Sequence, residues 1–238
     1  MAKNKKWILA AVAVLAVVLC CWAAWSKWAS TTRIGLVNFQ NYQTASLVKS
    51  NEDNFIEYEE IPLDRLDRLG RYDLVLGFGM GLKITEEQRA QILAAADEGT
   101  PIYIYAATNP ENDICSLDSL TKAGISAYIG NGNKRNYRNM ARYVRQHIDA
   151  KRLFVTPAEE AVESASDVLY HLDEDLSFKT VADYEKYLRE QGIYREKAPK
   201  IAIVGGLNDP FSGNRANIDS LIVSLQNAGM NVYPVSSY

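Results

Sequence analysis

Cysteine and histidine are scarce in this chain, and their scarcity excludes two kinds of site. Of three cysteines among 238 residues, Cys20 and Cys21 lie in an apolar N-terminal run and Cys115 is alone in the remainder. An intrachain disulfide in the body is therefore excluded. The two histidines are His147 and His171, and neither a CxxC nor an HExxH spacing occurs. The sequence predicts no metal site and no catalytic residue within this chain.

A strong net charge is also absent. The chain has 26 basic and 29 acidic residues and a formal net charge of -3, so no basic surface for a polyanion is indicated. We therefore expect no nucleic-acid partner. Apolar residues make up 47% of the chain, which is enough to bury a globular core without disulfides.

Complete phosphate-binding motifs are missing wherever glycines follow an expected strand. The stretch GGLNDPFSGNRANIDSLI (205–222) has neither the Gly-Lys-Ser/Thr end of a Walker loop nor three glycines at dinucleotide spacing. GFGMG (77–81) indicates a turn with positive backbone angles. IGNGNKRN (129–136) is either a plain loop or an anion site at a helix N-terminus. The sequence favours the plain loop.

The first of these loops nevertheless carries polar side chains at the carboxyl end of an expected strand, 200–206. Ligands of α/β sheets usually bind at that edge. The candidate substrate-binding residues are Asn208, Asp209, Ser212, Asn214 and Arg215. A polar turn that caps the following helix is the alternative interpretation.

A long apolar run near the N-terminus is the strongest single pattern. Nineteen consecutive apolar residues extend from Trp7 to Trp25, and a helix of that length spans roughly 28 Å, close to the hydrocarbon thickness of a bilayer. Lysines precede the run, which favours a cytoplasmic N-terminus. We expect residues 7–25 to cross the bacterial inner membrane once and to leave the body in the periplasm. A cleaved signal peptide is the alternative.

The body alternates strand-like and helix-like segments, which predicts an α/β fold with a doubly wound parallel sheet. Expected strands cover 33–39, 54–61, 72–79, 100–108, 126–130 and 152–158, and expected helices cover 85–99 and 133–148. The predicted organisation is an anchor at 1–30, an α/β domain at 31–158, a helical connector without strands at 159–199, and the beginning of a second α/β domain at 200–238.

His171 stands beside three consecutive acids, residues 173–175, in the expected connector. An imidazole next to carboxylates could ligate a metal ion. Three acids in a row are more typical of a solvated surface run, and we favour that interpretation. His147, in a helix rich in arginine, is expected on the surface.

The segment KIAIVGGLNDPFSGNRANIDSLIVSLQNAGMNVYPVSS (200–237) resembles the large-subunit (CobN/H-subunit) family of cobalt and magnesium chelatases. The resemblance implies that this chain is an N-terminal portion of such a protein. It also implies that further chelatase-like domains and the metal-insertion centre lie beyond Tyr238. No catalytic residue can be carried over to this chain.

An exported body would have no ATP, whereas the soluble large subunits of this family work with ATP-hydrolysing partners. The pattern is therefore more similar to membrane-anchored chelatase homologues of bacterial haem uptake, which implies removal of iron from haem. The reaction in the opposite direction, insertion of a metal into a corrinoid or porphyrin as in cobalamin biosynthesis, is the alternative. The tetrapyrrole would be substrate and the metal ion product or co-substrate, with no cofactor held by this chain. An anchored small-ligand binding protein and a tethered scaffold remain alternative functions.

Overall fold

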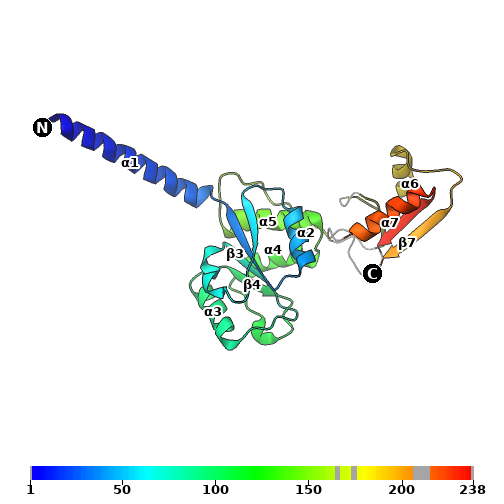
Figure 1. The fold of residues 1–238 in the computed structure, drawn as a ribbon, viewed down its shortest axis with the longest axis horizontal. Coiled ribbons are helices and arrows are strands. Elements are labelled where there is room, and N and C mark those ends of the chain that lie inside the picture. Colours follow the sequence, from blue (N-terminus) through cyan, green and yellow to red (C-terminus); the bar gives the residue numbers. More distant parts are fainter. Residues whose placement is uncertain (1, 164–166, 173–175, 206–214, 237–238) are drawn as a thin grey trace. The chain divides into compact units, whose positions relative to one another are not determined.

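The computed structural model describes residues 2–163, 167–172, 176–205 and 215–236 (Figure 1). Its first element is a long helix, α1 (Ala2–Trp28), whose side chains are described from Val12 onward. Among the described residues, no helix combines the length and apolar character needed to cross a membrane. The chain divides into two compact units, and α1 belongs to the first. Unit 1 comprises residues 1–38, 53–117 and 142–158, and unit 2 comprises 39–52, 118–141 and 159–238.

Unit 1 is built on a parallel four-stranded sheet. Its strands are β1 (Thr32–Val37), β2 (Ile56–Glu60), β3 (Leu74–Phe78) and β4 (Ile102–Tyr105). Their order is β2-β1-β3-β4, and every neighbouring pair is parallel. This confirms the predicted α/β fold and four of the expected strands.

The core of unit 1 explains why its strands are nearly continuous apolar runs. On one face Val75, Ile102 and Ile104 pack in one cluster with residues of the 3-10 helix η1 (Leu66–Arg71) and of α3 (Glu86–Asp97). The alternate positions Ile34 and Leu76 are just as buried. Strands covered on both faces need apolar side chains at every position, not at every second one.

The ends of α3 follow the sequence signals. Thr85 accepts a hydrogen bond from the backbone N–H of Gln88, whose side chain in turn accepts from the N–H of Thr85. This reciprocal pair is the predicted capping box. Gly99 follows the helix with φ +97°, and Gly81 in the predicted GFGMG turn has φ +71°. Both positions use conformations that side chains with a Cβ rarely adopt.

Two of the expected strands are wrong. Residues 126–130 form the last part of α4 (Ser119–Gly130), because Asp118 accepts hydrogen bonds from the N–H groups of Leu120 and Thr121 and starts a helix there. Short apolar runs do not distinguish a strand from a buried helix. Residues 152–158 form no strand, since the N–H groups of Arg152 and Leu153 bond to a carbonyl of α1 instead.

The basic helix expected at 133–148 is confirmed as α5 (Lys134–Tyr143) followed by a π-helical turn, η3 (Val144–Ile148). Two further helical elements, α2 (Asn41–Ser50) and the short η2 (Pro110–Asn112), have no counterpart in the sequence prediction. At the amino end of α5 the side chain of Asn133 accepts from the N–H of Asn136, as in an ordinary capped loop.

Unit 2 contains a second sheet, whose strands are β5 (Val168–Tyr170), β6 (Ser177–Phe178), β7 (Lys200–Gly205) and β8 (Asn231–Ser236). The order is β6-β5-β8-β7, with β7 and β8 parallel and β5 antiparallel to β8. The expectation that 159–199 holds no strand is therefore wrong. β5 and β6 are three and two residues long, too short for a visible alternation of apolar and polar side chains.

The second sheet is covered by one helix on each face. Val168 and Val232 pack with Ile222 of α7 (Ala216–Asn227), whereas the neighbouring positions Leu169 and Tyr233 pack in another cluster with residues of α6 (Val181–Glu190). One helix between two strands would be insufficient for a sheet buried on both faces. The segment before β7 supplies the missing strands and the missing helix.

Candidate functional site

The predicted binding loop follows β7 and ends at the start of α7. Asn208, Asp209, Ser212 and Asn214 lie outside the described residues, so their role stays a prediction. Arg215 is described and stands at the N-cap of α7. It is only 3% exposed, which is unusual for an arginine and requires partners within the protein.

The guanidinium of Arg215 connects α7 to β5. Its Nε donates to Oδ1 of Asp219 at 2.7 Å, and its Nη2 donates to the backbone carbonyl of His171. The group also lies over the ring of Tyr170, with 5.1 Å between Cζ and the ring centroid. Arg215 thus fixes the start of α7 against β5, and these contacts engage its cation inside the fold.

His171 is buried beside Arg215, with 2% of its surface exposed. Its Nε2 lies 2.8 Å from Nε2 of Gln226 on α7, so the amide donates and the imidazole accepts. Burial lowers the pKa of His171, and the charge of Arg215 lowers it further. The neutral ring is a packing and hydrogen-bonding group. The acidic run 173–175, which was expected on the surface, lies outside the described residues. His147, by contrast, is exposed as predicted.

Replacing His171 with glutamine is expected to flatten the dependence of unfolding temperature on pH. Because the pKa is lower in the folded than in the unfolded protein, the stability from this group is present above about pH 6.5 and is lost as pH falls below it. Thermal unfolding followed by circular dichroism at several pH values from 7 to 5 measures the slope. His147→Gln is the matched control and should keep the slope of the original chain; equal slopes in all three proteins would contradict the prediction.

On the other face of the same sheet, Glu185 of α6 is the centre of a polar cluster. Its Oε1 lies 2.6 Å from Nζ of Lys200 and accepts a hydrogen bond from the Tyr233 hydroxyl at 2.7 Å. These two donors lower the pKa of Glu185 to about 2, while burial and the nearby carboxylate raise that of Tyr233 to about 12. At neutral pH the cluster therefore holds a carboxylate, an ammonium group and a neutral phenol, and it clamps α6 to the sheet.

Neither of these clusters provides a metal centre. Within the part of the chain that the structure describes, no three His, Cys, Asp or Glu side chains are grouped closely enough to hold a metal ion. The two clusters have a structural role: they fix α6 and α7 to the sheet.

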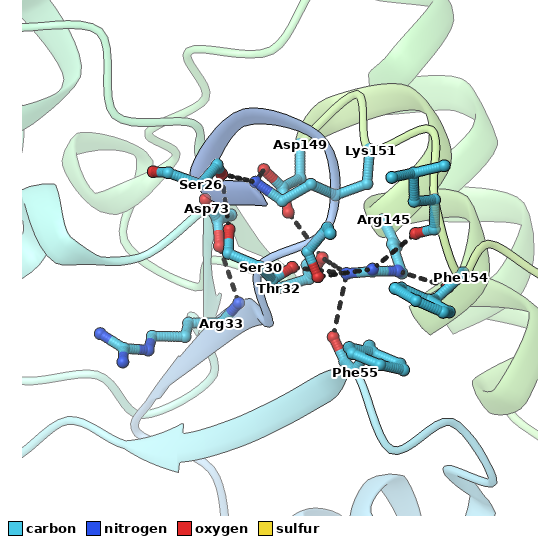
Figure 2. A network of polar contacts seen from close by, with 12 residues as sticks. Ser26, Ser30, Thr32, Arg33, Phe55, Asp73, Arg145, Asp149, Lys151 and Phe154 are labelled. Atoms are coloured by element: carbon cyan, nitrogen blue, oxygen red, sulfur yellow. Dashed lines mark hydrogen bonds and ion pairs between the residues drawn. The ribbon is translucent and has the colours of Figure 1, made fainter. Parts of the chain in front are cut away.

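Unit 1 contains a second polar network, which the sequence reasoning missed (Figure 2). Arg145, from η3, has no exposed surface. Its guanidinium donates to five backbone carbonyls, those of Ser30, Phe55, Leu153 and Phe154 at 2.9–3.1 Å and that of Ala29 at 3.4 Å, and to the hydroxyl of Thr32 at 2.9 Å. One buried cation thus joins the end of α1, the starts of β1 and β2, and the segment after η3.

The network continues to a buried ion pair. Nζ of Lys151 lies 3.0 Å from Oδ1 of Asp149 and donates to the carbonyl of Ser26 in the last turn of α1. Asp149 also accepts from the Thr32 hydroxyl at 2.6 Å. Asp73 accepts from the N–H of Arg33, and its pKa is raised by burial and by the charge of Asp149.

A cavity of about 420 Å³ borders this network and is lined by Gly70, Tyr72, Asp73, Glu98, Gly99, Thr100, Pro101, Ile148 and Asp149. Asp73 and Pro101 directly precede β3 and β4, so the cavity lies at the amino edge of the sheet. Ligands of parallel sheets bind at the opposite edge. We therefore assign the network a structural role.

One signal in the sequence could have identified Arg145. Met140, Ala141 and Val144 are the buried apolar positions of this helical stretch, and position 145 follows Ala141 by four residues. Residues four apart share a helix face, so Arg145 belongs to the buried side. The many arginines of the segment concealed this, since charged residues on a helix are normally solvated.

Comparisons with known proteins agree with the arrangement in unit 2. Residues 126–238 match the family model described as CobN/Magnesium Chelatase. Among solved structures, the chain is similar to the "Catalytic Subunit of Cobaltochelatase from Mycobacterium tuberculosis", with a TM-score of 0.56 and 16% sequence identity. The similarity covers 87% of this chain but 16% of that subunit. No curated protein sequence matches this chain.

Proposed function

We propose that this chain is part of a chelatase-like protein acting on a metallated tetrapyrrole, because residues 126–238 match the CobN/Magnesium Chelatase family model. The family match is the observation that carries the proposal. The chain spans 16% of the length of the cobaltochelatase subunit it is similar to. We therefore assign the chemistry at the metal to further domains of a longer protein. We assign binding of the edge of the macrocycle to residues 206–214 of this chain.

We propose removal of iron from haem as the reaction, with metal insertion into a corrinoid or porphyrin as the other direction. Demetallation breaks the iron–nitrogen bonds, places protons on the pyrrole nitrogens and transfers the metal to a new set of ligands. The described residues of this chain contribute none of these steps. Its own contribution would be the segment 206–214, whose sequence offers amide, hydroxyl and carboxylate groups and directly precedes Arg215.

We also propose that α1 anchors the chain in the bacterial inner membrane, with the N-terminus cytoplasmic and the body periplasmic. Along α1 the described apolar side chains are exposed, and the large ones are Val12, Val14, Leu15, Val17, Val18, Leu19, Trp22, Trp25 and Trp28. A continuous exposed apolar surface of this kind needs an apolar surrounding. Three lysines precede this stretch, which supports the orientation.

An anaerobic haem titration tests the reaction. Haem is added to this chain and, in parallel, to the product of its complete reading frame, while the haem absorption band and free-porphyrin fluorescence are followed. Binding by both proteins with porphyrin released by the longer one is the expected result. Failure of both proteins to bind haem would contradict the proposal and favour a small-ligand binding protein.

The loop is tested by the double variant Asn208→Ala/Asn214→Ala. Loss of two hydrogen bonds to the ligand is expected to weaken haem affinity about tenfold. Ser224→Ala on α7 is the matched control, because the Ser224 hydroxyl donates within its own helix, to the carbonyl of Ser220. If the double variant binds haem as tightly as the control, the loop does not contact the macrocycle.

A further inference from the structure

An exposed apolar pair lies directly beside the end of α1. Leu153 and Phe154 are 50% and 56% exposed, and the nearby tryptophans Trp25 and Trp28 of α1 are 52% and 38% exposed. The ring of Phe154 stacks on Phe55, with centroids 4.6 Å apart, and its centroid lies 6.1 Å from that of Trp25. Two segments far apart in sequence therefore present one apolar surface.

The backbone under this surface is held rigidly. The N–H groups of Arg152 and Leu153 both donate to the carbonyl of Trp28, at 3.2 and 2.9 Å. Arg145 donates to the carbonyls of Leu153 and Phe154, both at 3.0 Å, and Figure 2 shows Arg145 next to Phe154. The loop 152–154 is thus fixed to the last turn of α1 on one side and to a buried cation on the other.

Phe154 also has a left-handed backbone conformation, with φ +54°. For a bulky residue this conformation is unfavourable and is maintained only where surrounding contacts impose it. Here the contacts with Arg145 impose it, and the result is an aromatic side chain exposed next to α1. A polar residue or glycine would satisfy the same backbone without exposing apolar surface.

The chemistry of this surface matches the headgroup region of a bilayer. Indole rings favour that region, and apolar side chains flanked by cations bind anionic lipid interfaces. Lys27 and Arg152 are the exposed cations of these two segments. Because the loop is bonded to the last turn of α1, it lies where the helix would leave the membrane.

We propose that the loop 152–154, with Trp25 and Trp28, forms a second membrane contact that inserts into the interfacial region of an anionic bilayer beside α1. This inference rests on the membrane anchoring proposed above. The contact fixes the orientation of unit 1, so that the amino edge of its sheet faces the lipid. The carboxyl edge, at which parallel sheets bind ligands, then faces away from the membrane.

Site-specific fluorescence of the full chain in vesicles tests the contact. In a background with Cys20, Cys21 and Cys115 replaced by serine, single cysteines are introduced by Leu153→Cys, Val14→Cys or Leu93→Cys and labelled with an environment-sensitive dye. Leu93 is a matched control, since it is an apolar residue of unit 1 on α3 and is 45% exposed. The vesicles contain phosphatidylcholine and phosphatidylglycerol with nitroxide lipids that quench either near the headgroups or at the bilayer centre.

The expected result is loss of fluorescence at position 153 with the shallow quencher, at position 14 with the deep quencher, and at position 93 with neither. Quenching at 14 but not at 153 would overturn the loop contact and leave the anchor intact. Absence of quenching at both positions would overturn the anchor and the loop contact together. A dye at 153 shielded from water but not quenched by either lipid would indicate a protein partner and would also overturn the proposal.

Discussion

Replacing Arg145 with methionine is expected to lower the free energy of unfolding of unit 1 by about 3–5 kcal/mol. Methionine fills much of the same volume, but it leaves five backbone carbonyls without the donor that now reaches them. Buried carbonyls without partners are costly because water cannot replace the lost donor. The total free energy of unfolding of a small domain is only about 5–15 kcal/mol. This single change therefore removes a large part of the stability of unit 1.

Hydrogen exchange of the β1 and β3 amides in detergent, with and without urea, measures the loss. Arg68→Met is the matched control: Arg68 also lies in unit 1, its side chain is 62% exposed, and its ion pair with Asp67 is solvated, so we expect a change within about 0.5 kcal/mol. Arg145→Lys should fall between the two, because a single ammonium group cannot reach all the acceptors. Equal protection in Arg145→Met and Arg68→Met would show that the network contributes little.

Replacing Tyr184 with alanine is expected to lower the free energy of unfolding of unit 2 by about 3–5 kcal/mol. Tyr184 on α6 has no exposed surface and packs with Leu169, Leu188 and Tyr233 in one of the two cores of this unit. Its hydroxyl donates to the carbonyl of Val232 at 2.9 Å. The change therefore creates a cavity and also removes the donor of a buried hydrogen bond.

Tyr184→Phe separates the two effects. It keeps the ring and loses the hydroxyl alone, so we expect a loss of only about 1 kcal/mol, the usual net contribution of one hydrogen bond. Urea titrations in detergent, followed by hydrogen exchange of the β8 amides, compare the two variants with the original chain. If alanine and phenylalanine destabilise equally, the ring is not part of the core and the hydroxyl accounts for the whole effect.

Sequence reasoning identified neither of these residues, although it predicted the helical segments that carry them. The helix at 133–148 was predicted from its periodicity, and a helical segment was expected between 159 and 199. A periodic pattern shows which positions share a face of a helix. It does not show which partner that face will meet.

The separation in sequence between interacting residues explains which features could be predicted and which could not. Capping boxes, glycine turns and strands buried on both faces depend on residues within a few positions of one another, and these predictions were confirmed for α3 and for β1, β3 and β4. The strands β5 and β6 were not predicted, because both are short and because β5 pairs with β8, a segment distant in sequence. The predicted site residues Asn208, Asp209, Ser212 and Asn214 remain to be tested by the haem titration.

The sequence by itself determined the α/β class, the parallel sheet of unit 1, the apolar N-terminal helix and the resemblance to the chelatase family. These follow from local composition and from the pattern of residues 200–237. Only the tertiary structure decided that Arg145 and His171 are buried. Arg145 bonds to Ser30, 115 positions away, and His171 to Gln226, 55 positions away. A polar residue can be buried only where the fold supplies its partners, and partners so distant are brought together by packing and not by any local pattern.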